Sequence, residues 1–188
     1  MATTIPVPDP DAGIAVVRDG DRTIVAAEPS EIVEARGSDA FAVLDGLTPG
    51  WWAGVLAYDL GRAVERVVPR LADDLQLPDL LFARYAARLV IEDGSARLEG
   101  TAPARRRLEE LLERTAPPAL PPLLGPPRSS LDREAFESGV RAIVALVEAG
   151  QCYQVNLTRR LLWDRAVDLR ALFHALGIAN PAPHAALI

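Results

Sequence analysis

The sequence contains no lysine, and all 20 of its basic residues are arginine. A Schiff base, a lysine nucleophile and the phosphate-binding lysine of a Walker-type loop all need an ε-amino group, so this chain supplies none of them. The chain has one cysteine, Cys152, and two histidines, His174 and His184. These are too few soft or imidazole ligands for a zinc site, and a lone cysteine forms no internal disulfide. A bound metal ion would need carboxylate ligands.

Basic residues are also fewer than acidic residues. Acidic residues outnumber basic residues by 26 to 20, which gives a net charge of -6 and a pI near 5.0. Nucleic acid and anionic lipid both attract concentrated positive charge, so we expect neither as a partner. We find no pattern of a secretory leader and no apolar run long enough to cross a membrane. The expected location is the cytoplasm, whose reducing conditions suit a chain without disulfides.

Length and composition are those of a folded protein. The 188 residues are 49% hydrophobic and 24% charged, which fits one domain, or one small domain and part of another. Six prolines lie close together in residues 117–128, where they remove backbone donors and fix φ. We interpret this segment as a linker that follows an N-terminal domain, residues 1–116. The alternative is an irregular loop that crosses the surface of one domain.

Short apolar runs separated by turn residues predict that strands dominate the N-terminal domain. Asp19-Gly20-Asp21 predicts one hairpin turn, and Glu92-Asp93-Gly94 predicts another, which follows an apolar run at Phe82–Ile91. Trp51–Tyr58 is a further predicted strand. Its Gly54 indicates a bulge or a close approach of another backbone.

Four stretches have the spacing of apolar residues that is typical of amphipathic helices. They are residues 39–47, 104–114, 136–147 and 169–176. Ser130 or Asp132 is suited to cap the third helix and Gly150 to end it. Gly177 and Asn180-Pro181-Ala182-Pro183 are expected to end the fourth. We expect the apolar stripe of the third helix to be buried. A charge placed on that stripe, as in Val144→Asp, would then cost several kcal/mol.

Alternation of polar and apolar residues predicts a strand over Cys152–Thr158, with a polar face that includes Cys152, Gln154 and Asn156. The apolar run at His184–Ile188 is a further predicted strand. The expected fold class is therefore α+β, with mostly antiparallel sheets flanked by helices.

General catalytic motifs are absent: the sequence has no glycine-rich phosphate loop, no HExxH, no CxxC and no GxSxG. His174 lies in a predicted helix, where an ordinary helix residue is the simpler interpretation. His184 follows two prolines and is placed to line a pocket built from loops. Trp51 and Trp52 point to opposite faces of a strand, so at least one belongs to the core; a surface that stacks on a ligand is the alternative.

Four segments resemble one family of enzymes. Residues 151–160, QCYQVNLTRR, resemble the AGDxYQVNLTxRF signature of aminodeoxychorismate synthase component I. Residues 180–187, NPAPHAAL, resemble the NPAPxxAxL segment of the same family. Residues 51–62, WWAGVLAYDLGR, are similar to its GGxxGxxxYDLGR stretch, and residues 24–29 to its VAEP strand end. The resemblance covers nearly the whole chain in the right order.

This resemblance implies chemistry on chorismate. The wider family includes anthranilate, isochorismate and salicylate synthases, and Asn156 favours the aminodeoxychorismate branch, because the anthranilate branch typically has QVVLS at this place. In that branch Mg²⁺ held by carboxylates grips chorismate. Ammonia from glutamine amidotransferase component II replaces the 4-hydroxyl group and gives 4-amino-4-deoxychorismate, a precursor of para-aminobenzoate and folate. The alternatives are anthranilate synthase component I and a non-catalytic remnant that binds an amino acid or the amidotransferase.

The catalytic lysine of the family lies in a PIKGT segment beyond NPAP, as do its SPE glutamate and its magnesium ligands. None of these has a counterpart in the 188 residues. The resemblance therefore implies a truncated fold of the anthranilate synthase component I type, in which residues 129–188 are an incomplete start of the chorismate-binding domain. We assign no catalytic and no metal-binding residue, and we expect the isolated chain to be inactive.

The resemblance also implies an amino-acid site. Members of the family hold tryptophan between the N-terminal sheet and the loop that follows NPAP. By position, Pro183, His184 and Ala185 match that loop. Tyr153 and Asn156 match residues of the neighbouring strand. We therefore expect tryptophan as a further ligand of these five residues.

Overall fold

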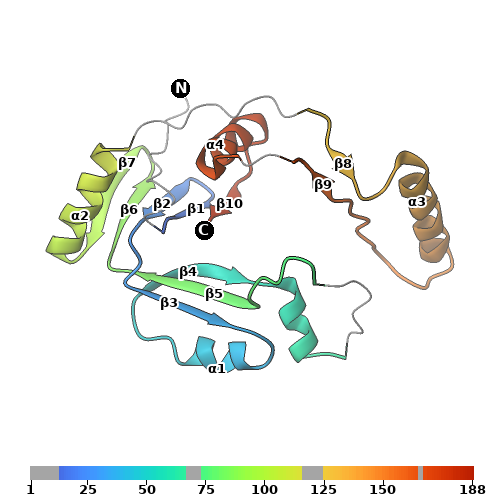
Figure 1. Cartoon of the computed structure of the whole chain (residues 1–188), viewed down its shortest axis with the longest axis horizontal. Helices are drawn as coiled ribbons and strands as arrows, with labels where there is room; N and C mark the ends of the chain where they lie inside the picture. Colours follow the sequence, from blue (N-terminus) through green and yellow to red (C-terminus); the bar gives the residue numbers. More distant parts are fainter. Residues whose placement is uncertain (1–12, 67–72, 116–124, 165–166) are drawn as a thin grey trace. The chain divides into compact units, whose positions relative to one another are not determined.

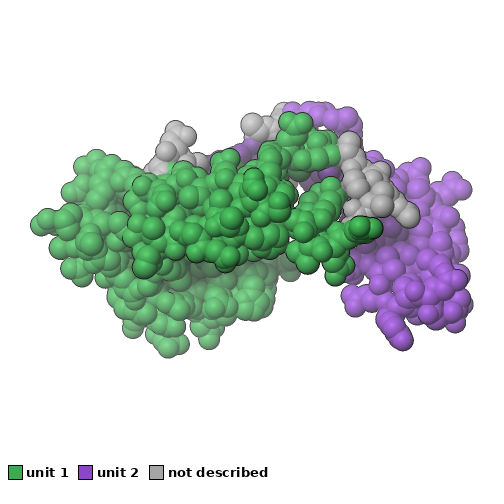
Figure 2. All heavy atoms as spheres, turned by 90° about the horizontal axis from the view of Figure 1, so that it is seen from below, with its two compact units in different colours: residues 1–120, 169–188 green, residues 121–168 purple. Residues whose placement is uncertain are grey.

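The computed structural model describes residues 13–66, 73–115, 125–164 and 167–188. The chain forms two compact units, which Figure 2 shows in different colours. The first unit consists of residues 1–120 and 169–188, and the second of residues 121–168. Most of the predicted linker, residues 117–124, lies outside the described residues. The assignment of residues 129–188 to the start of a second domain stays a prediction.

A five-stranded antiparallel sheet organises the first unit (Figure 1). Its strands, in spatial order, are β10 (His184–Leu187), β1 (Ala15–Asp19), β2 (Arg22–Ala26), β6 (Ala87–Glu92) and β7 (Ser95–Gly100). Both predicted hairpins are confirmed, since β1 pairs with β2 and β6 with β7. Gly20 and Gly94 adopt positive φ values of 60° and 73°, which a glycine adopts without steric cost.

A three-stranded antiparallel sheet lies in the same unit and has the order β3 (Glu31–Ala35), β5 (Leu80–Tyr85), β4 (Trp51–Leu56). The close backbone approach expected at Gly54 is confirmed, because a Cβ atom there would lie 2.2 Å from the carbonyl oxygen of Leu81. The apolar run at Phe82–Ile91 belongs to two strands of different sheets, with Ala86 between them. The run contains no glycine or proline that would mark this crossover.

Helices cover one face of each sheet. Helices α2 (Ala102–Glu113) and α4 (Leu169–Ala179) pack on the five-stranded sheet through side chains that include Leu108 and Phe173. Helix α1 (Asp39–Asp45) and the 3-10 helix η2 (Tyr58–Ala63) pack on the three-stranded sheet. Between the two sheets, the buried residues are mostly small: Ala15, Ala26, Ala53, Ala83 and Tyr85. The predicted α+β class with antiparallel sheets and flanking helices is confirmed.

Helix α4 ends at Ala179, directly before the predicted stop at Asn180-Pro181-Ala182-Pro183, but it continues through Gly177, the other predicted stop. A Cβ atom at Gly177 would lie 2.9 Å from a terminal guanidinium nitrogen of Arg18. The glycine therefore serves the packing of a neighbouring side chain instead of ending the helix. Sequence spacing alone does not distinguish these two uses of glycine.

The second unit contains helix α3 (Arg133–Glu148) and the short strands β8 (Arg128–Ser129) and β9 (Leu161–Leu162), which pair with each other. The predicted cap is confirmed, because Asp132 Oδ1 accepts a hydrogen bond from Ala135 N at 2.8 Å. The predicted strand at Cys152–Thr158 is wrong, since this segment has no regular secondary structure. Alternation supplies strand-like side chains, but a strand also needs a partner for its backbone groups, and none of the described strands pairs with this segment.

The predicted burial of the α3 stripe is also wrong. Val140, Val144 and Val147 are 40%, 49% and 41% exposed, and no α3 residue is buried. Next to the stripe, a Cβ atom at Gly139 would lie 2.9 Å from Leu157 Cδ2, so Leu157 packs closely against the helix there. The periodicity correctly predicted an amphipathic helix, but a stripe is buried only where other apolar groups cover it.

Candidate functional site

The segment expected to bind an amino acid lies beside the first hairpin of the first unit. Strand β10 pairs antiparallel with β1, which places His184 opposite Asp19. His184 Nδ1 lies 3.1 Å from Asp19 Oδ1, and Gly20 N donates a hydrogen bond to Pro183 O at 2.8 Å. Pro183 therefore lies just before β10, while His184 and Ala185 are its first two residues.

A pocket of about 320 Å³ opens next to this segment, between β1, β10 and α4. Its lining consists of Arg18, Phe173, Leu176, Gly177, Asn180, Ala182, Ala185 and Ala186. The guanidinium carbon of Arg18 lies 5.5 Å from the centre of the Phe173 ring, within the range of a cation–π contact. Of the three residues expected in the ligand loop, Ala185 lines this pocket, and Pro183 and His184 flank it.

Tyr153 and Asn156 lie in the second unit, in an irregular and exposed segment. The strand that neighbours β10 is β1, so the expectation that these two residues lie on a neighbouring strand is wrong. The family's sequence motif is present in this segment, but the strand that the resemblance implied does not form there. A role of Tyr153 and Asn156 in holding a ligand stays a prediction.

Arg18 is the pocket residue that sequence reasoning missed. Strand alternation puts Arg18 on the same face as the fully buried Val16, which packs toward α2 and α4. The sequence signal for Arg18 is a charged residue two positions after a core residue, on the same face of the strand; this signal was overlooked. Among its lining residues the pocket combines a guanidinium, an aromatic ring and a side-chain amide, so it is equipped to bind a ligand with an acidic group, not to perform acid–base or nucleophilic chemistry.

An ion pair fixes the segment that follows β2. Glu28 accepts hydrogen bonds from Arg107 of α2, and the shortest joins Nη2 to Oε1 at 2.6 Å. This hydrogen bonding holds the pKa of Glu28 below its ordinary value and the pKa of Arg107 above its own. Glu28 belongs to the segment that resembles VAEP, so in this chain the motif connects the sheet to α2.

The tryptophan pair shows one core residue, as expected. Trp51 packs against the buried cluster between the sheets, and its ring centre lies 5.6 Å from that of Tyr85. Trp52 is half-buried, and its Nε1 donates a hydrogen bond to Thr48 O at 2.9 Å. His174 lies half-buried within α4, where its sequence position predicted an ordinary helix residue.

Within the described part of the chain, no three His, Cys, Asp or Glu side chains come together as a metal site would require. The described residues thus offer no site for the magnesium ion that the family resemblance implies, and the binding of magnesium stays a prediction. No helix of the described residues is long and apolar enough to span a membrane.

The comparisons with known proteins agree on one family. Residues 11–188 match the chorismate binding enzyme family. Aminodeoxychorismate synthase component 1 from Klebsiella aerogenes is 33% identical over 72% of this chain and 31% of its own length. Anthranilate synthase component 1 from Thermus thermophilus is 34% identical over 72% of this chain and 32% of its own length. The chain therefore spans about a third of the length of the curated relatives it matches.

The fold agrees as well. The crystal structure of anthranilate synthase component I from Streptococcus pneumoniae matches with a TM-score of 0.64 at 17% sequence identity, over 87% of this chain and 46% of that chain. The expected fold of the anthranilate synthase component I type is thereby confirmed, and the chain covers less than half of it. The quoted motifs, the sheet topology and the family match lead to the same assignment: the chain belongs to the chorismate binding enzyme family.

Proposed function

We propose that this chain is the N-terminal part of aminodeoxychorismate synthase component I. The observation that carries the proposal is the YQVNLT sequence at residues 153–158, where Asn156 fits the aminodeoxychorismate branch. The 33% identity to the Klebsiella aerogenes protein of that name supports it. The reaction would be the amination of chorismate to 4-amino-4-deoxychorismate in para-aminobenzoate and folate synthesis, in the cytoplasm.

In this proposal the chain contributes binding and support rather than chemistry. Neither the sequence nor the described residues supply the lysine or the metal-ligand cluster that the branch uses. The magnesium ion, the nucleophile and the acids would belong to the part of the relatives that this chain does not span. The partner that supplies ammonia would be glutamine amidotransferase component II.

We also propose that the pocket at Arg18 and Ala185 holds an amino acid of the tryptophan type. The Arg18 guanidinium is suited to a carboxylate, and Phe173 with the alanines of β10 offers an apolar wall. A titration with tryptophan tests this, with Arg18→Gln as the variant and Arg22→Gln as the control on the neighbouring strand. We expect binding to the parent chain and to Arg22→Gln, and a loss of about tenfold in Arg18→Gln.

Anthranilate synthase component I is the second candidate. It is supported by the 34% identity to the Thermus thermophilus protein and by the structural neighbour. A third candidate is a non-catalytic remnant that binds an amino acid or the amidotransferase subunit. The absence of lysine from the sequence supports this third candidate.

Reconstitution and product analysis separate these candidates. The chain is mixed with the remaining two thirds of either the Klebsiella or the Thermus relative, together with chorismate, ammonium and magnesium. We expect 4-amino-4-deoxychorismate, identified by mass spectrometry, from the Klebsiella pairing alone. Anthranilate from the Thermus pairing alone would overturn the proposal in favour of the second candidate, and no product from either pairing would favour the remnant.

A further inference from the structure

A second pocket of the first unit lies where the chain leaves β5 and enters β6. Its volume is about 500 Å³, within the range of about 300 to 1,000 Å³ that is typical of small-molecule sites. The residues that carry the argument are Trp51, Arg84, Tyr85, Arg88 and Glu99. None of them lines the pocket at Arg18, so the two sites are separate.

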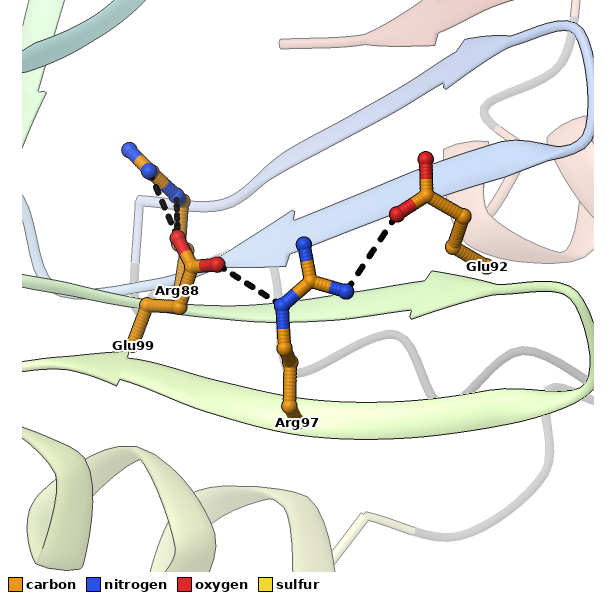
Figure 3. A network of polar contacts seen from close by, with 4 residues as sticks. All are labelled: Arg88, Glu92, Arg97 and Glu99. Atoms are coloured by element: carbon orange, nitrogen blue, oxygen red, sulfur yellow. Dashed lines mark hydrogen bonds and ion pairs between the residues drawn. The ribbon is translucent and has the colours of Figure 1, made fainter.

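Arg88 is held in one orientation by its neighbours. It lies opposite Glu99 in the β6–β7 pairing, and its Nε and Nη2 contact Glu99 Oε2 at 2.9 and 2.6 Å. Its guanidinium carbon lies 5.4 Å from the centre of the Trp51 ring. Figure 3 shows Glu99 between the guanidinium groups of Arg88 and Arg97. The second terminal nitrogen of Arg88, Nη1, takes no part in these bonds.

The carboxylate of Glu99 stays ionised in this network. Hydrogen bonds from Arg88 and Arg97 hold the pKa of Glu99 below its ordinary value. Arg97 also reaches Glu92, with Nη1 and Oε2 3.3 Å apart. Arg97 and Glu92 are not among the residues that line the pocket, so Arg97 shares the network with Arg88 without facing the cavity.

Arg84 supplies a second guanidinium to the same pocket. Its Nη2 donates a hydrogen bond to Pro49 O at 2.8 Å, and its Nη1 lies 3.8 Å from Glu31 Oε2. A Cβ atom at Gly50 would lie 2.7 Å from Arg84 Nε, so the glycine leaves the space that this side chain occupies. Because both arginines are already held, a ligand would cost little additional side-chain entropy on binding.

The remaining wall is aromatic and includes a free hydrogen-bond donor. Tyr85 is 6% exposed, and burial raises its pKa, so its hydroxyl keeps its proton at neutral pH. Among the residues that the structure describes, no group forms a hydrogen bond with this hydroxyl. The hydroxyl is therefore available to donate a hydrogen bond to an acceptor atom of a ligand.

We propose that this pocket binds a small planar carboxylate, of which benzoate is the simplest representative. The two guanidinium groups carry positive charge and N–H donors beyond those used in these contacts, and both suit a carboxylate. Trp51 and Tyr85 offer the apolar surface for a ring. The ligand is an anion because two guanidinium groups and a single carboxylate, Glu99, line the pocket.

Calorimetric titration of the full chain with sodium benzoate tests the proposal, with sodium chloride at matched ionic strength as the reference. Benzamide has the same shape without the charge. We expect saturable binding of one benzoate per chain and binding of benzamide that is at least about tenfold weaker. Equal binding of the two compounds, or no binding of benzoate, would overturn the proposal.

Variants separate a ligand contact from a structural role. Arg84→Gln and Arg88→Gln should each weaken benzoate binding by about tenfold or more. Arg97→Gln is the matched control, because it breaks the same network outside the pocket and should change the affinity less than about twofold. Circular dichroism and thermal unfolding show which variants keep the fold. An equal loss in Arg97→Gln would assign the effect to the network and contradict the proposal. Chorismate takes no part in this test, so its failure would leave the proposed function untouched.

Discussion

Gly54 illustrates how a single residue controls the contact between two strands. It lies in β4, opposite Phe82 of β5. A Cβ atom at this position would lie 2.2 Å from Leu81 O and 2.6 Å from Phe82 Cγ. Backbone atoms of a paired strand cannot move away without breaking the pairing, so the position accepts no side chain.

We therefore expect Gly54→Ala to destabilise the first unit by roughly 2 kcal/mol or more, as overpacking does in cores. Gly61→Ala is the control, because no atom lies within 4 Å of the corresponding Cβ position and φ is not positive there. Urea unfolding measures both free energies. A loss for Gly54→Ala no larger than that for Gly61→Ala would show that β4 and β5 are farther apart than described.

The ion pair of Glu28 and Arg107 predicts a pH dependence at a single site. The pKa of Glu28 is lower in the folded chain than its ordinary value of 4.5. A carboxyl group with a lowered pKa stabilises the fold above its unfolded-state pKa, and this contribution is lost as the pH falls through the folded-state pKa. Both side chains are 40% or more exposed, so solvent screens the pair and the effect is small.

Arg107→Ala should thus lower the melting temperature near neutral pH, and the difference from the parent chain should shrink as the pH falls through the lowered pKa of Glu28 and its carboxylate takes up a proton. Thermal unfolding followed by circular dichroism at several pH values measures this. Arg106→Ala, an exposed neighbour on α2, is the control and should show no such trend. A difference that stays constant on acidification would show that Arg107 acts through packing alone.

Helix α3 shows that the formation of a helix and the burial of its apolar residues have different causes. Its sequence provides an N-cap, and its apolar residues fall on one stripe, so a helix forms as predicted. Yet three valines of the stripe, Val140, Val144 and Val147, are 40% or more exposed. Exposed apolar residues in a row mark a surface that a binding partner or a further part of the fold would cover.

Val144→Asp should accordingly cost less than about 1 kcal/mol in this chain, because the carboxylate stays hydrated and the helix propensities of Val and Asp are similar. Leu108→Asp is the matched change on α2, where the side chain is 3% exposed, and it should cost several kcal/mol. Amide hydrogen exchange of each helix reports the two effects separately. Equal losses would mean that the α3 stripe is buried in solution.

For the whole molecule, the comparison of lengths matters most. The chain spans about a third of its curated relatives and 46% of the solved structure. The sequence has no lysine, and the described residues form no cluster of three metal-ligating side chains. A reaction that needs a lysine nucleophile therefore cannot take it from this chain.

We expect the purified chain to form no aminated product from chorismate, ammonium and magnesium. The measurement is mass spectrometry of the reaction mixture over several hours, with the Klebsiella relative as the active control. A heat-sensitive product formed by the chain itself, at a rate proportional to its concentration, would contradict this prediction. It would also show that other residues replace the missing lysine.

Local signals in the sequence determined much of the architecture. Turn tripeptides at residues 19–21 and 92–94 fixed two hairpins, because the backbone of a tight turn depends on its own residues. Apolar spacing located all four predicted helices, and the glycine in β4 marked a close approach. The quoted motifs were enough to identify the family, since such motifs depend on the order of residues alone.

Tertiary structure alone decided which segments meet. Alternation at residues 152–158 produced no strand because no strand in the described ranges pairs with that segment, and Gly177 packs against Arg18 instead of ending a helix. The pocket at Arg18 and the one at Arg84 and Arg88 each unite residues far apart in the chain. Pairing, burial and pocket formation are properties of contacts between distant segments, so a local pattern predicts the elements and not their neighbours.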